Sequence, residues 1–222
     1  MDAQVVKLGG SLTLNPEKLK ALCIKLSEIS TSFKLILVPG GGEFSDVVRD
    51  ADKRLKLSPE VSHRMAILGM DQYGFLLSDL IKNSCVVNQL EKIQEALDLN
   101  KLPIFLPSNI MLKNDPLENS WDVTSDSIAV YVANQLDICK VVLLTDVDGI
   151  FTCDPKQFSE AKLISKLSAK QLEDMQQRTS VDKFLPKLLS QLKIECFVVN
   201  GFDVNRVEAL LKGENVVGTI IS

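Results

Sequence analysis

The 222-residue sequence lacks several features that mark particular protein classes. It has no apolar run near the ~20 residues that a membrane-spanning helix needs, and it does not open with a charged segment followed by an apolar one, so we expect no membrane partner and no secretion signal. Lysine and arginine are spread along a chain of net charge −4 rather than gathered into a basic face. We therefore expect no nucleic-acid partner either.

Cysteine and histidine are sparse. The five cysteines are scattered and odd in number, no Cys-x-x-Cys pair is present, and His63 is the single histidine. Neither a zinc site nor a disulfide framework is supported by this pattern, and we predict no metal ion held by the protein itself. A reducing cytoplasm is the simplest location for such a chain.

What the sequence does contain is an alternation of short apolar runs with longer amphipathic segments. The runs predict buried strands at Gln4–Leu8, Leu35–Val38, Leu102–Phe105, Val141–Thr145 and Cys196–Val199. Apolar residues at helical spacing predict helices at Asn15–Ile29, Glu43–Lys56, Ser62–Asn83, Glu91–Leu97, Ser125–Leu136, Ser168–Gln177 and Val204–Lys212. The polar, turn-rich segment Asn109–Asp122 is expected to be a loop or a hairpin flap. The alternation predicts an α/β fold, a three-layer α/β/α sandwich around a mainly parallel sheet, in a single domain over residues 1–222.

Two glycine-rich segments directly follow predicted strands. They are Lys7-Leu8-Gly9-Gly10-Ser11 and Pro39-Gly40-Gly41-Gly42-Glu43, and the second opens a predicted helix. Glycines at a strand end let backbone N–H groups approach a phosphate, and a helix N-terminus adds a positive dipole end. An ordinary turn and a flexible connector are the alternatives, and neither a Walker A loop nor a Rossmann fingerprint is present. We expect a side chain at Gly41 to be excluded by the bound phosphate and by a positive φ.

Carboxylates, hydroxyls and lysines gather in three further segments. Asp122-Val123-Thr124-Ser125-Asp126-Ser127 precedes a predicted helix, and capping of that helix by Thr124 or Ser125 is the simpler alternative. The segment from Thr145 to Pro155 is rich in aspartate and follows a predicted strand, but its Asp-Gly and Asp-Pro pairs are also common in turns. Lys183 and Lys187 precede another predicted helix, where most lysines are simply solvated.

In this order the five segments resemble the amino acid kinase superfamily, which includes acetylglutamate kinase, aspartokinase, uridylate kinase and isopentenyl phosphate kinase. The resemblance runs from Val5 to Ile221, and its most specific part extends from Thr124 to Pro155. It implies an enzyme, a kinase that uses ATP and Mg²⁺, with an acceptor-binding half at about residues 1–136 and a nucleotide-binding half at about residues 137–222. A non-catalytic nucleotide- or oxyanion-binding protein of the same fold is the alternative from another class.

The resemblance also implies roles for individual residues. Lys7 holds the transferring phosphoryl group, Asp126 orients the lysines, and Lys187 is the second phosphate lysine, with Lys183 as its possible substitute. Backbone N–H groups for phosphates come from Gly9, Gly10, Ser11, Gly40, Gly41 and Gly42. The nucleotide site comprises Thr145, Asp146, Gly149, Ile150, Phe151, Asp154, Pro155 and Lys183.

Finer motifs narrow the resemblance. No histidine follows the glycine triplet as in isopentenyl phosphate kinases, and no Arg-Gly follows it as in uridylate kinases. The segments Pro39–Phe44, Met65–Gly74 and Ser120–Asp126 resemble instead a group of small archaeal-type kinases of methanofuran biosynthesis, which convert aminomethyl-furan-methyl phosphate to its diphosphate. This resemblance implies a phosphorylated amine as acceptor, with Asp71, Tyr73, Trp121, Asp122 and Thr124 around it. A kinase for uridylate, isopentenyl phosphate or another phosphorylated metabolite is the nearest alternative, and the apolar helix at Ser62–Asn83 indicates a homodimer or a higher homo-oligomer.

Overall fold

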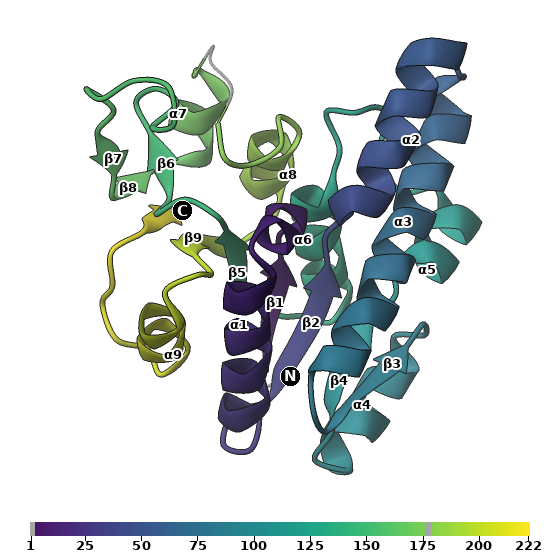
Figure 1. The fold of residues 1–222 in the computed structure, drawn as a ribbon, viewed down its shortest axis with the longest axis vertical. Coiled ribbons are helices and arrows are strands. Elements are labelled where there is room, and N and C mark those ends of the chain that lie inside the picture. The colour runs from purple at the N-terminus through teal and green to yellow at the C-terminus, as the bar shows by residue number, and fades with distance from the viewer. Residues whose placement is uncertain (1–2, 176–178) are drawn as a thin grey trace.

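The computed structural model describes residues 3–175 and 179–222, which form an eight-stranded sheet with helices on both faces (Figure 1). The sheet order is β3-β4-β2-β1-β5-β9-β10-β8. Its strands are β1 Gln4–Leu8, β2 Leu35–Pro39, β3 Ser84–Val87, β4 Leu102–Phe105, β5 Lys140–Thr145, β8 Lys166–Leu167, β9 Glu195–Asn200 and β10 Thr219–Ile221. Only the β9–β10 pair is antiparallel among these neighbours. The predicted sandwich with a mainly parallel sheet is confirmed.

Helices connect the strands and cover the sheet. They are α1 Pro16–Ile29, α2 Gly42–Leu55, α3 Pro59–Leu80, α4 Glu91–Asp98, α5 Ser108–Asn114, α6 Ser125–Gln135, α7 Ala169–Glu173, α8 Leu185–Gln191 and α9 Val204–Leu211, with a 3₁₀ turn η1 at Gly10–Leu14 and a small hairpin of β6 Ile150–Phe151 and β7 Leu163–Ile164. In the described residues no helix is both long and apolar enough to cross a lipid bilayer.

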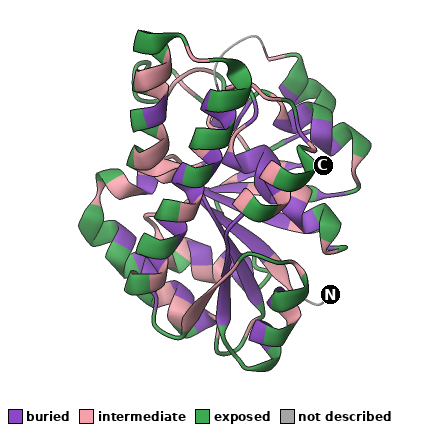
Figure 2. Ribbon diagram, turned by 90° about the vertical axis from the view of Figure 1, so that its right-hand side faces the viewer, coloured by how far each residue is buried: buried purple, intermediate pink, exposed green. Residues whose placement is uncertain are grey.

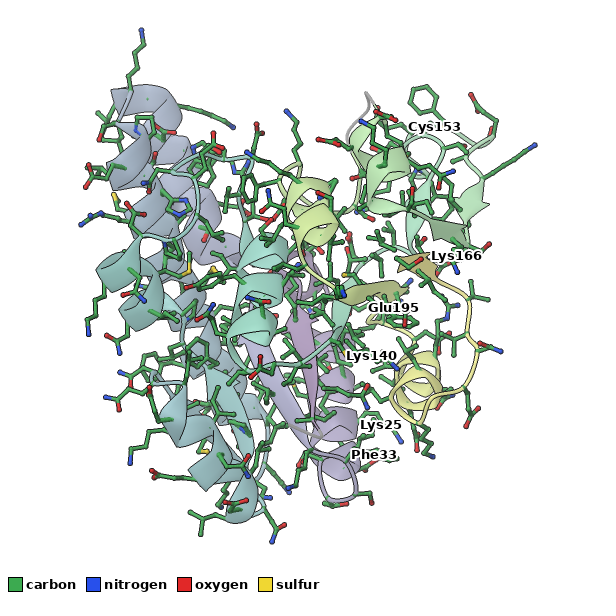
Figure 3. All side chains as sticks on the ribbon, turned by 180° about the vertical axis from the view of Figure 1, so that it is seen from behind. Lys25, Phe33, Lys140, Cys153, Lys166 and Glu195 are labelled. Atoms are coloured by element: carbon green, nitrogen blue, oxygen red, sulfur yellow. The ribbon has the colours of Figure 1, made fainter. Side chains whose placement is uncertain are left out.

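Alternate residues of the strands supply two hydrophobic cores. On β1, Val5 packs into the core that contains residues of α6 and α8, whereas Val6 and Leu8 pack into the core that contains residues of α1 and α9. Strands buried on both faces need apolar residues at every position, which explains why the sequence shows continuous runs instead of alternation. Figure 2 shows the buried residues concentrated along the central strands and the exposed ones on the outer helix surfaces. Lys25 of α1, labelled in Figure 3, lies 3.0 Å from Glu208 of α9 and joins these two helices.

Three sequence-based expectations need correction. The segment Asn109–Asp122 is not a loop throughout, because α5 occupies Ser108–Asn114, buries Met111 against the core and ends at Asp115 in a left-handed conformation. The helix expected at Ser168–Gln177 is described only as α7, Ala169–Glu173, and its last predicted residues lie outside the described part of the chain. Lys187 lies inside α8, not before it.

Candidate active site

The two glycine segments touch each other beyond the carboxyl ends of β1 and β2. A Cβ built on Gly10 would lie 2.2 Å from the backbone nitrogen of Gly42, and one on Gly40 would lie 2.6 Å from that of Gly10. These contacts are backbone to backbone, so neither position has room for any side chain. The close approach of two chain segments thus accounts for glycine at 10 and 40, whatever ligand binds there.

The positive φ that was expected at Gly41 is found instead at Gly42. The φ of Gly41 is −83°, and a Cβ there would lie 2.1 Å from Oγ of Ser45, which donates to the carbonyl of Ala66. The residue with a left-handed backbone is Gly42, at φ +55°. The expected positive φ at Gly41 is therefore wrong, and a side chain there is excluded by α2 itself rather than by positive φ.

Helix α2 begins at Gly42 without a side-chain cap. The first N–H groups of a helix have no intrahelical acceptor, and here they open onto a cavity of about 800 Å³. The cavity is lined by both glycine segments, by α2 and α3, and by residues 121–126 and 179–183. An uncapped helix start facing a cavity is a favourable site for an anionic group.

A buried ion pair lies beside this cavity. Lys7 is the last residue but one of β1. Its Nζ is 2.6 Å from Oδ1 of Asp126 at the start of α6, and both side chains are less than a tenth exposed. The other carboxylate oxygen of Asp126 accepts the backbone N–H of Asp182 at 3.1 Å. The structure thus brings together two of the three residues predicted to be catalytic.

Asp182 is a residue of the cavity that the sequence analysis missed. Its buried carboxylate accepts five hydrogen bonds, from N–H and Oγ1 of Thr124, N–H and Oγ of Ser127, and N–H of Leu185, at 2.6–3.1 Å. It therefore caps the starts of both α6 and α8, so Thr124 does not cap α6 with its own side chain. Burial, and then the negative charge of Asp126, raise the pKa of Asp182 to about 6, while the hydrogen bonds from Ser127 and Thr124 oppose the rise. An aspartate shortly before a helix is the signal that could have identified it.

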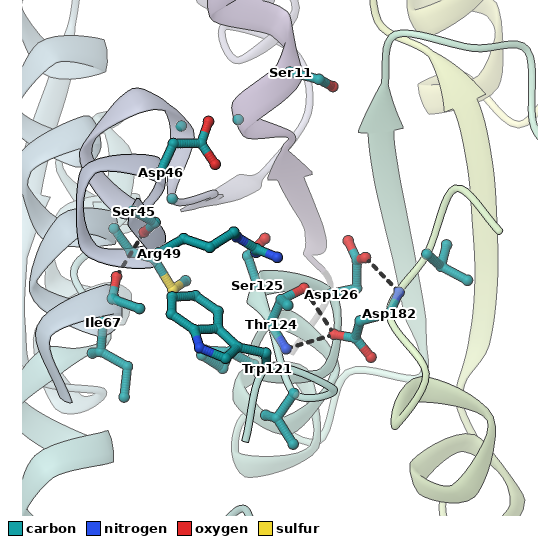
Figure 4. A pocket seen from close by; sticks show the side chains of 18 of the residues that line it. Ser11, Ser45, Asp46, Arg49, Ile67, Trp121, Thr124, Ser125, Asp126 and Asp182 are labelled. Carbon is teal, nitrogen blue, oxygen red and sulfur yellow. Dashed lines mark hydrogen bonds between the residues drawn. The ribbon is translucent and has the colours of Figure 1, made fainter. Parts of the chain in front are cut away.

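Trp121 lies against α2 at the cavity wall. The guanidinium of Arg49 sits over its indole ring, 4.4 Å from the ring centroid, and the indole Nε1 donates to Oδ2 of Asp52 at 2.6 Å. Figure 4 shows Arg49 reaching across the Trp121 ring toward Ser125. One face of the ring that was expected to meet the acceptor is therefore already occupied by Arg49.

The other residues predicted to bind the acceptor divide into two groups. Thr124 and Asp122 line the cavity, and Asp122 is 3.3 Å from Nζ of Lys183. Tyr73 is fully buried in the core formed with α1, and burial raises its pKa, so its predicted contact with an acceptor is corrected. Asp71 accepts the N–H of Ser108 at 3.3 Å, at the junction of α3 and α5, with a pKa raised by burial, and it is not among the cavity residues.

His63 is a second missed residue of the cavity. It lies near the N-terminus of α3, is only 6% exposed, and its Nε2 has no hydrogen-bond partner among the described residues. Burial lowers its pKa, against a hydrogen bond to the Ser120 backbone and the charge of Asp115. The lowered pKa favours the neutral form of the imidazole.

Most of the predicted nucleotide residues lie on or beside the loop after β5, and Lys183 is the exception. Asp146 bonds to the ammonium of Lys156 and to Ser11, and although burial acts to raise its pKa, these bonds outweigh burial and lower it. Gly149 has a φ of +154°, Ile150 donates its N–H to Oγ1 of Thr219, and Asp154 accepts the N–H of Lys156. Of the remaining predicted nucleotide residues, Thr145 is buried at the end of β5, Phe151 lies in β6, and Pro155 is exposed.

The two lysines of the last segment are separated. Lys183 lines the cavity, whereas Lys187 is exposed on α8 with its Nζ 5.1 Å from the Phe184 ring centroid. The structure does not bring Lys187 to the Lys7–Asp126 pair, so its role as second phosphate lysine stays a prediction, with Lys183 as the rival.

Comparison with known proteins shows which family the chain belongs to. A family model described as the amino acid kinase family matches residues 2–200. A [5-(aminomethyl)furan-3-yl]methyl phosphate kinase from Methanocaldococcus jannaschii is 38% identical over 220 residues, covering 98% of this chain and 96% of the relative. A uridylate kinase from Thermococcus kodakarensis is 27% identical over 233 residues, covering 98% of each chain.

Solved structures show the same fold. The crystal structure of uridylate kinase from Archaeoglobus fulgidus matches with a TM-score of 0.78 at 21% identity, over 100% of both chains. The UMP kinase from Bacillus anthracis also matches with a TM-score of 0.78 at 21% identity, over 100% of this chain and 96% of that one. The family match, together with the 38% identical relative that spans nearly the whole chain, shows that this protein belongs to the amino acid kinase family and is a kinase.

Proposed function

We propose that this kinase transfers a phosphoryl group from ATP to the phosphate of a small acceptor bound in the cavity between α2, α3 and the start of α6. The observation that carries the proposal is the buried Lys7–Asp126 pair, 2.6 Å apart, beside the point where the two glycine segments cross. Removing two charges from water is costly, and catalytic sites are where such arrangements gather.

Lys7 supplies the positive charge in the proposed reaction. Phosphoryl transfer needs little covalent chemistry from the protein, and positioning with electrostatic stabilisation dominates. Asp126 fixes the direction of the Lys7 ammonium, while Asp182 holds the N-termini of α6 and α8 in place around it. The uncapped start of α2 adds backbone N–H donors for phosphate oxygens.

We assign ATP to the side of Lys7 that carries the loop after β5, in the half at about residues 137–222. The hydrogen bond between Ser11 and Asp146 joins this loop to the first glycine segment, so phosphates lying there would be close to Lys7. Within the described residues, no three carboxylate, imidazole or thiol groups are placed to hold a metal ion. Mg²⁺ accompanying ATP would therefore take its ligands mainly from phosphate oxygens and water.

For the acceptor we propose aminomethyl-furan-methyl phosphate, giving the diphosphate used in methanofuran biosynthesis. The support is the 38% identity to the M. jannaschii kinase of that substrate over nearly the whole chain. Thr124 and Asp122 line the cavity, and Asp122 is one of its carboxylates, with Glu43 and Asp46, that would accept a hydrogen bond from the amine.

Steady-state kinetics with four acceptors test this assignment. We expect aminomethyl-furan-methyl phosphate to have the highest kcat/KM, above its analogue with hydroxyl in place of the amine, uridylate and isopentenyl phosphate. Loss of a charge-assisted hydrogen bond to the amine should raise the acceptor KM by about 10- to 100-fold. Equal kcat/KM for the amine and its hydroxyl analogue would remove the amine contact, and faster turnover of uridylate would replace the acceptor altogether.

We also propose that the kinase assembles as a homodimer or a higher homo-oligomer through α3. This helix exposes an apolar stripe made of Val61, Met65, Leu68, Phe75 and Leu76, each between 36% and 57% exposed. Contiguous exposed apolar surface of this kind marks a protein–protein contact. A cytoplasmic location is proposed alongside it, since all five cysteines are free thiols.

A further inference from the structure

Arg49 and Asp52 lie on the same face of α2, and both contact the indole ring of Trp121. Residues three apart on a helix are neighbours, and here Arg49 covers the face of Trp121 at 4.4 Å while Asp52 accepts its N–H at 2.6 Å. The indole is thus fixed in position by its polar edge, and it offers its flat face to the guanidinium. Trp121 belongs to the segment that leads into α6, so the three residues fasten this segment to α2.

Among the residues that the structure describes, the guanidinium of Arg49 has no carboxylate partner for its charge. It is half-buried in the cavity wall, and among the ion pairs of the described residues none includes Arg49. Its Nε is enclosed and has no hydrogen-bond partner. A planar guanidinium stacked on an aromatic ring keeps its N–H edge free for a planar or tetrahedral oxyanion.

We propose that Arg49 binds the phosphate of the acceptor, and that Trp121 and Asp52 are positioning residues that hold its guanidinium for this contact. The inference rests on the proposed function and adds to it the residue that selects a phosphorylated acceptor. Arg49 shares the cavity with Gly41 and Gly42, and it reaches across it toward Ser125 at the start of α6 (Figure 4). An acceptor phosphate lying between them would meet the N-terminus of α2 and the guanidinium together, while Lys7 faces the group in transfer.

The rival explanation is that Arg49, Trp121 and Asp52 only fasten the segment before α6 to α2. Substitutions in residues with such a structural role would lower the stability of the protein and weaken the binding of the acceptor and of ATP alike. A phosphate clamp would instead affect the acceptor and leave ATP untouched. The two explanations therefore differ in which affinity changes when each side chain is altered.

Trp121 is the only tryptophan of the chain, so its fluorescence reports directly on the group stacked upon it. We would titrate the protein with aminomethyl-furan-methyl phosphate, with UMP and with orthophosphate, following tryptophan emission. Arg49→Gln should weaken binding of the preferred phosphomonoester by about 10- to 100-fold, the effect of one charge-assisted hydrogen-bonding group. Arg49→Lys should recover only part of this, because an ammonium cannot form a planar fork. Arg54→Gln is the matched control, since Arg54 is exposed five residues further along α2 and bonds only to the Asp50 carbonyl among the contacts known for its guanidinium.

The positioning pair is tested by kinetics on Asp52→Ala, Trp121→Phe and the double variant. Phenylalanine keeps an aromatic face and removes the N–H, so both single changes break the same hydrogen bond. We expect each to raise the acceptor KM by about 3- to 10-fold, the net effect of one typical intramolecular hydrogen bond, with the KM for ATP unchanged. The double variant should be no worse than the more affected single variant. Asp52→Asn, which retains an acceptor oxygen, should be close to normal, and Asp50→Ala on the exposed face is the control.

The outcomes separate the clamp from the acceptor assignment. Binding of UMP or orthophosphate with full dependence on Arg49, but no binding of the furan phosphate, would support the clamp and overturn the proposed acceptor. Equal affinity of Arg49→Gln and the unaltered protein for all three probes would overturn the clamp. A lower melting temperature with an unchanged acceptor KM in Asp52→Ala and Trp121→Phe would reduce these two residues to a fastener.

Discussion

The two regions that the proposed reaction places around its phosphates are built in different ways. Where the glycine segments cross, backbone meets backbone, and a single added carbon at Gly10 would lie 2.2 Å from the Gly42 nitrogen. On the loop after β5, the corresponding contacts are between side chains, chiefly the bond from Lys156 to Asp146. The first region thus depends on glycines that leave no room for a side chain, whereas the second depends on side-chain contacts, which a substitution can replace.

The ion pairs of the two regions differ in the same sense. The side chains of Lys7 and Asp126 are 8% and 7% exposed, whereas those of Lys156 and Asp146 are 59% and 14% exposed. Breaking a buried pair leaves an uncompensated charge at a cost of several kcal/mol, while an exposed pair contributes about 0–1 kcal/mol. We therefore expect sensitivity to substitution to fall steeply from the glycine crossing to the β5 loop.

Substitution at the glycine crossing should have the largest effect. Gly10→Ala forces the two segments apart, because the clash is with the backbone of Gly42 and no side chain can rotate away. We expect a loss of at least about 1–3 kcal/mol in the free energy of unfolding, typical of overpacking, and at least a hundredfold loss of kcat, as about 1 Å of misplacement can produce. Denaturant unfolding and steady-state kinetics measure the two.

Gly213→Ala is the control for that experiment. Its φ of +88° makes alanine strained, but a Cβ there meets nothing within 4 Å. It should therefore cost about 1–2 kcal/mol of stability through the backbone alone and leave kcat unchanged. A Gly10→Ala protein that retains normal kcat would show that the two segments separate without moving the site.

Removal of single lysines should have the next largest effect and should rank the three candidates. Lys7→Ala should lower kcat by about 10²–10³-fold, the typical effect of one preorganised donor, with little change in ATP affinity. Lys183→Ala and Lys187→Ala decide which of these lysines, the one at the cavity wall or the exposed one on α8, assists in the transfer. Near-normal turnover of Lys7→Ala would remove Lys7 from the mechanism, and a 10²-fold loss in Lys187→Ala would show that α8 must move during the reaction cycle.

Sequence patterns predicted the elements whose periodicity is set by the cores. The five predicted strands all lie in the sheet, within a residue of their observed ends, because strands buried on both faces are apolar throughout. The edge strand β3 and the short strands β8 and β10 were missed, since Ser84–Val87 is only half-buried and lacks a fully apolar run, and the others have two or three residues. Their pairing depends on neighbours distant in the sequence.

The site shows the same limit. Lys7, the glycines and Asp126 stand at strand ends and a helix start, where a local pattern carries information. Asp182 accepts hydrogen bonds from the starts of two helices, α8, which follows it directly, and α6, where Ser127 lies 55 residues earlier in the sequence. No local pattern shows that its carboxylate reaches Ser127. Tyr73 was placed at the acceptor because the family resemblance puts its segment there, but a resemblance of segments does not tell which face of α3 turns toward the sheet, and Tyr73 lies on the face that packs into the core.

The smallest effect should come from the β5 loop. Lys156→Ala removes the partner of Asp146, yet Asp146 keeps its hydrogen bond with Ser11, and the lysine side chain is already 59% exposed. A surface pair worth about 0–1 kcal/mol allows at most about a fivefold rise in the KM for ATP, with an unchanged melting temperature and an unchanged KM for the acceptor. Raising the salt concentration should shrink even this difference, because exposed charges are screened, whereas the defect of Lys7→Ala should persist. The decisive measurement is the KM for ATP of both variants at low and high ionic strength. A tenfold or larger effect of Lys156→Ala that survives high salt would mean that Lys156 touches the nucleotide itself, and that the exposed region is as exacting as the glycine crossing.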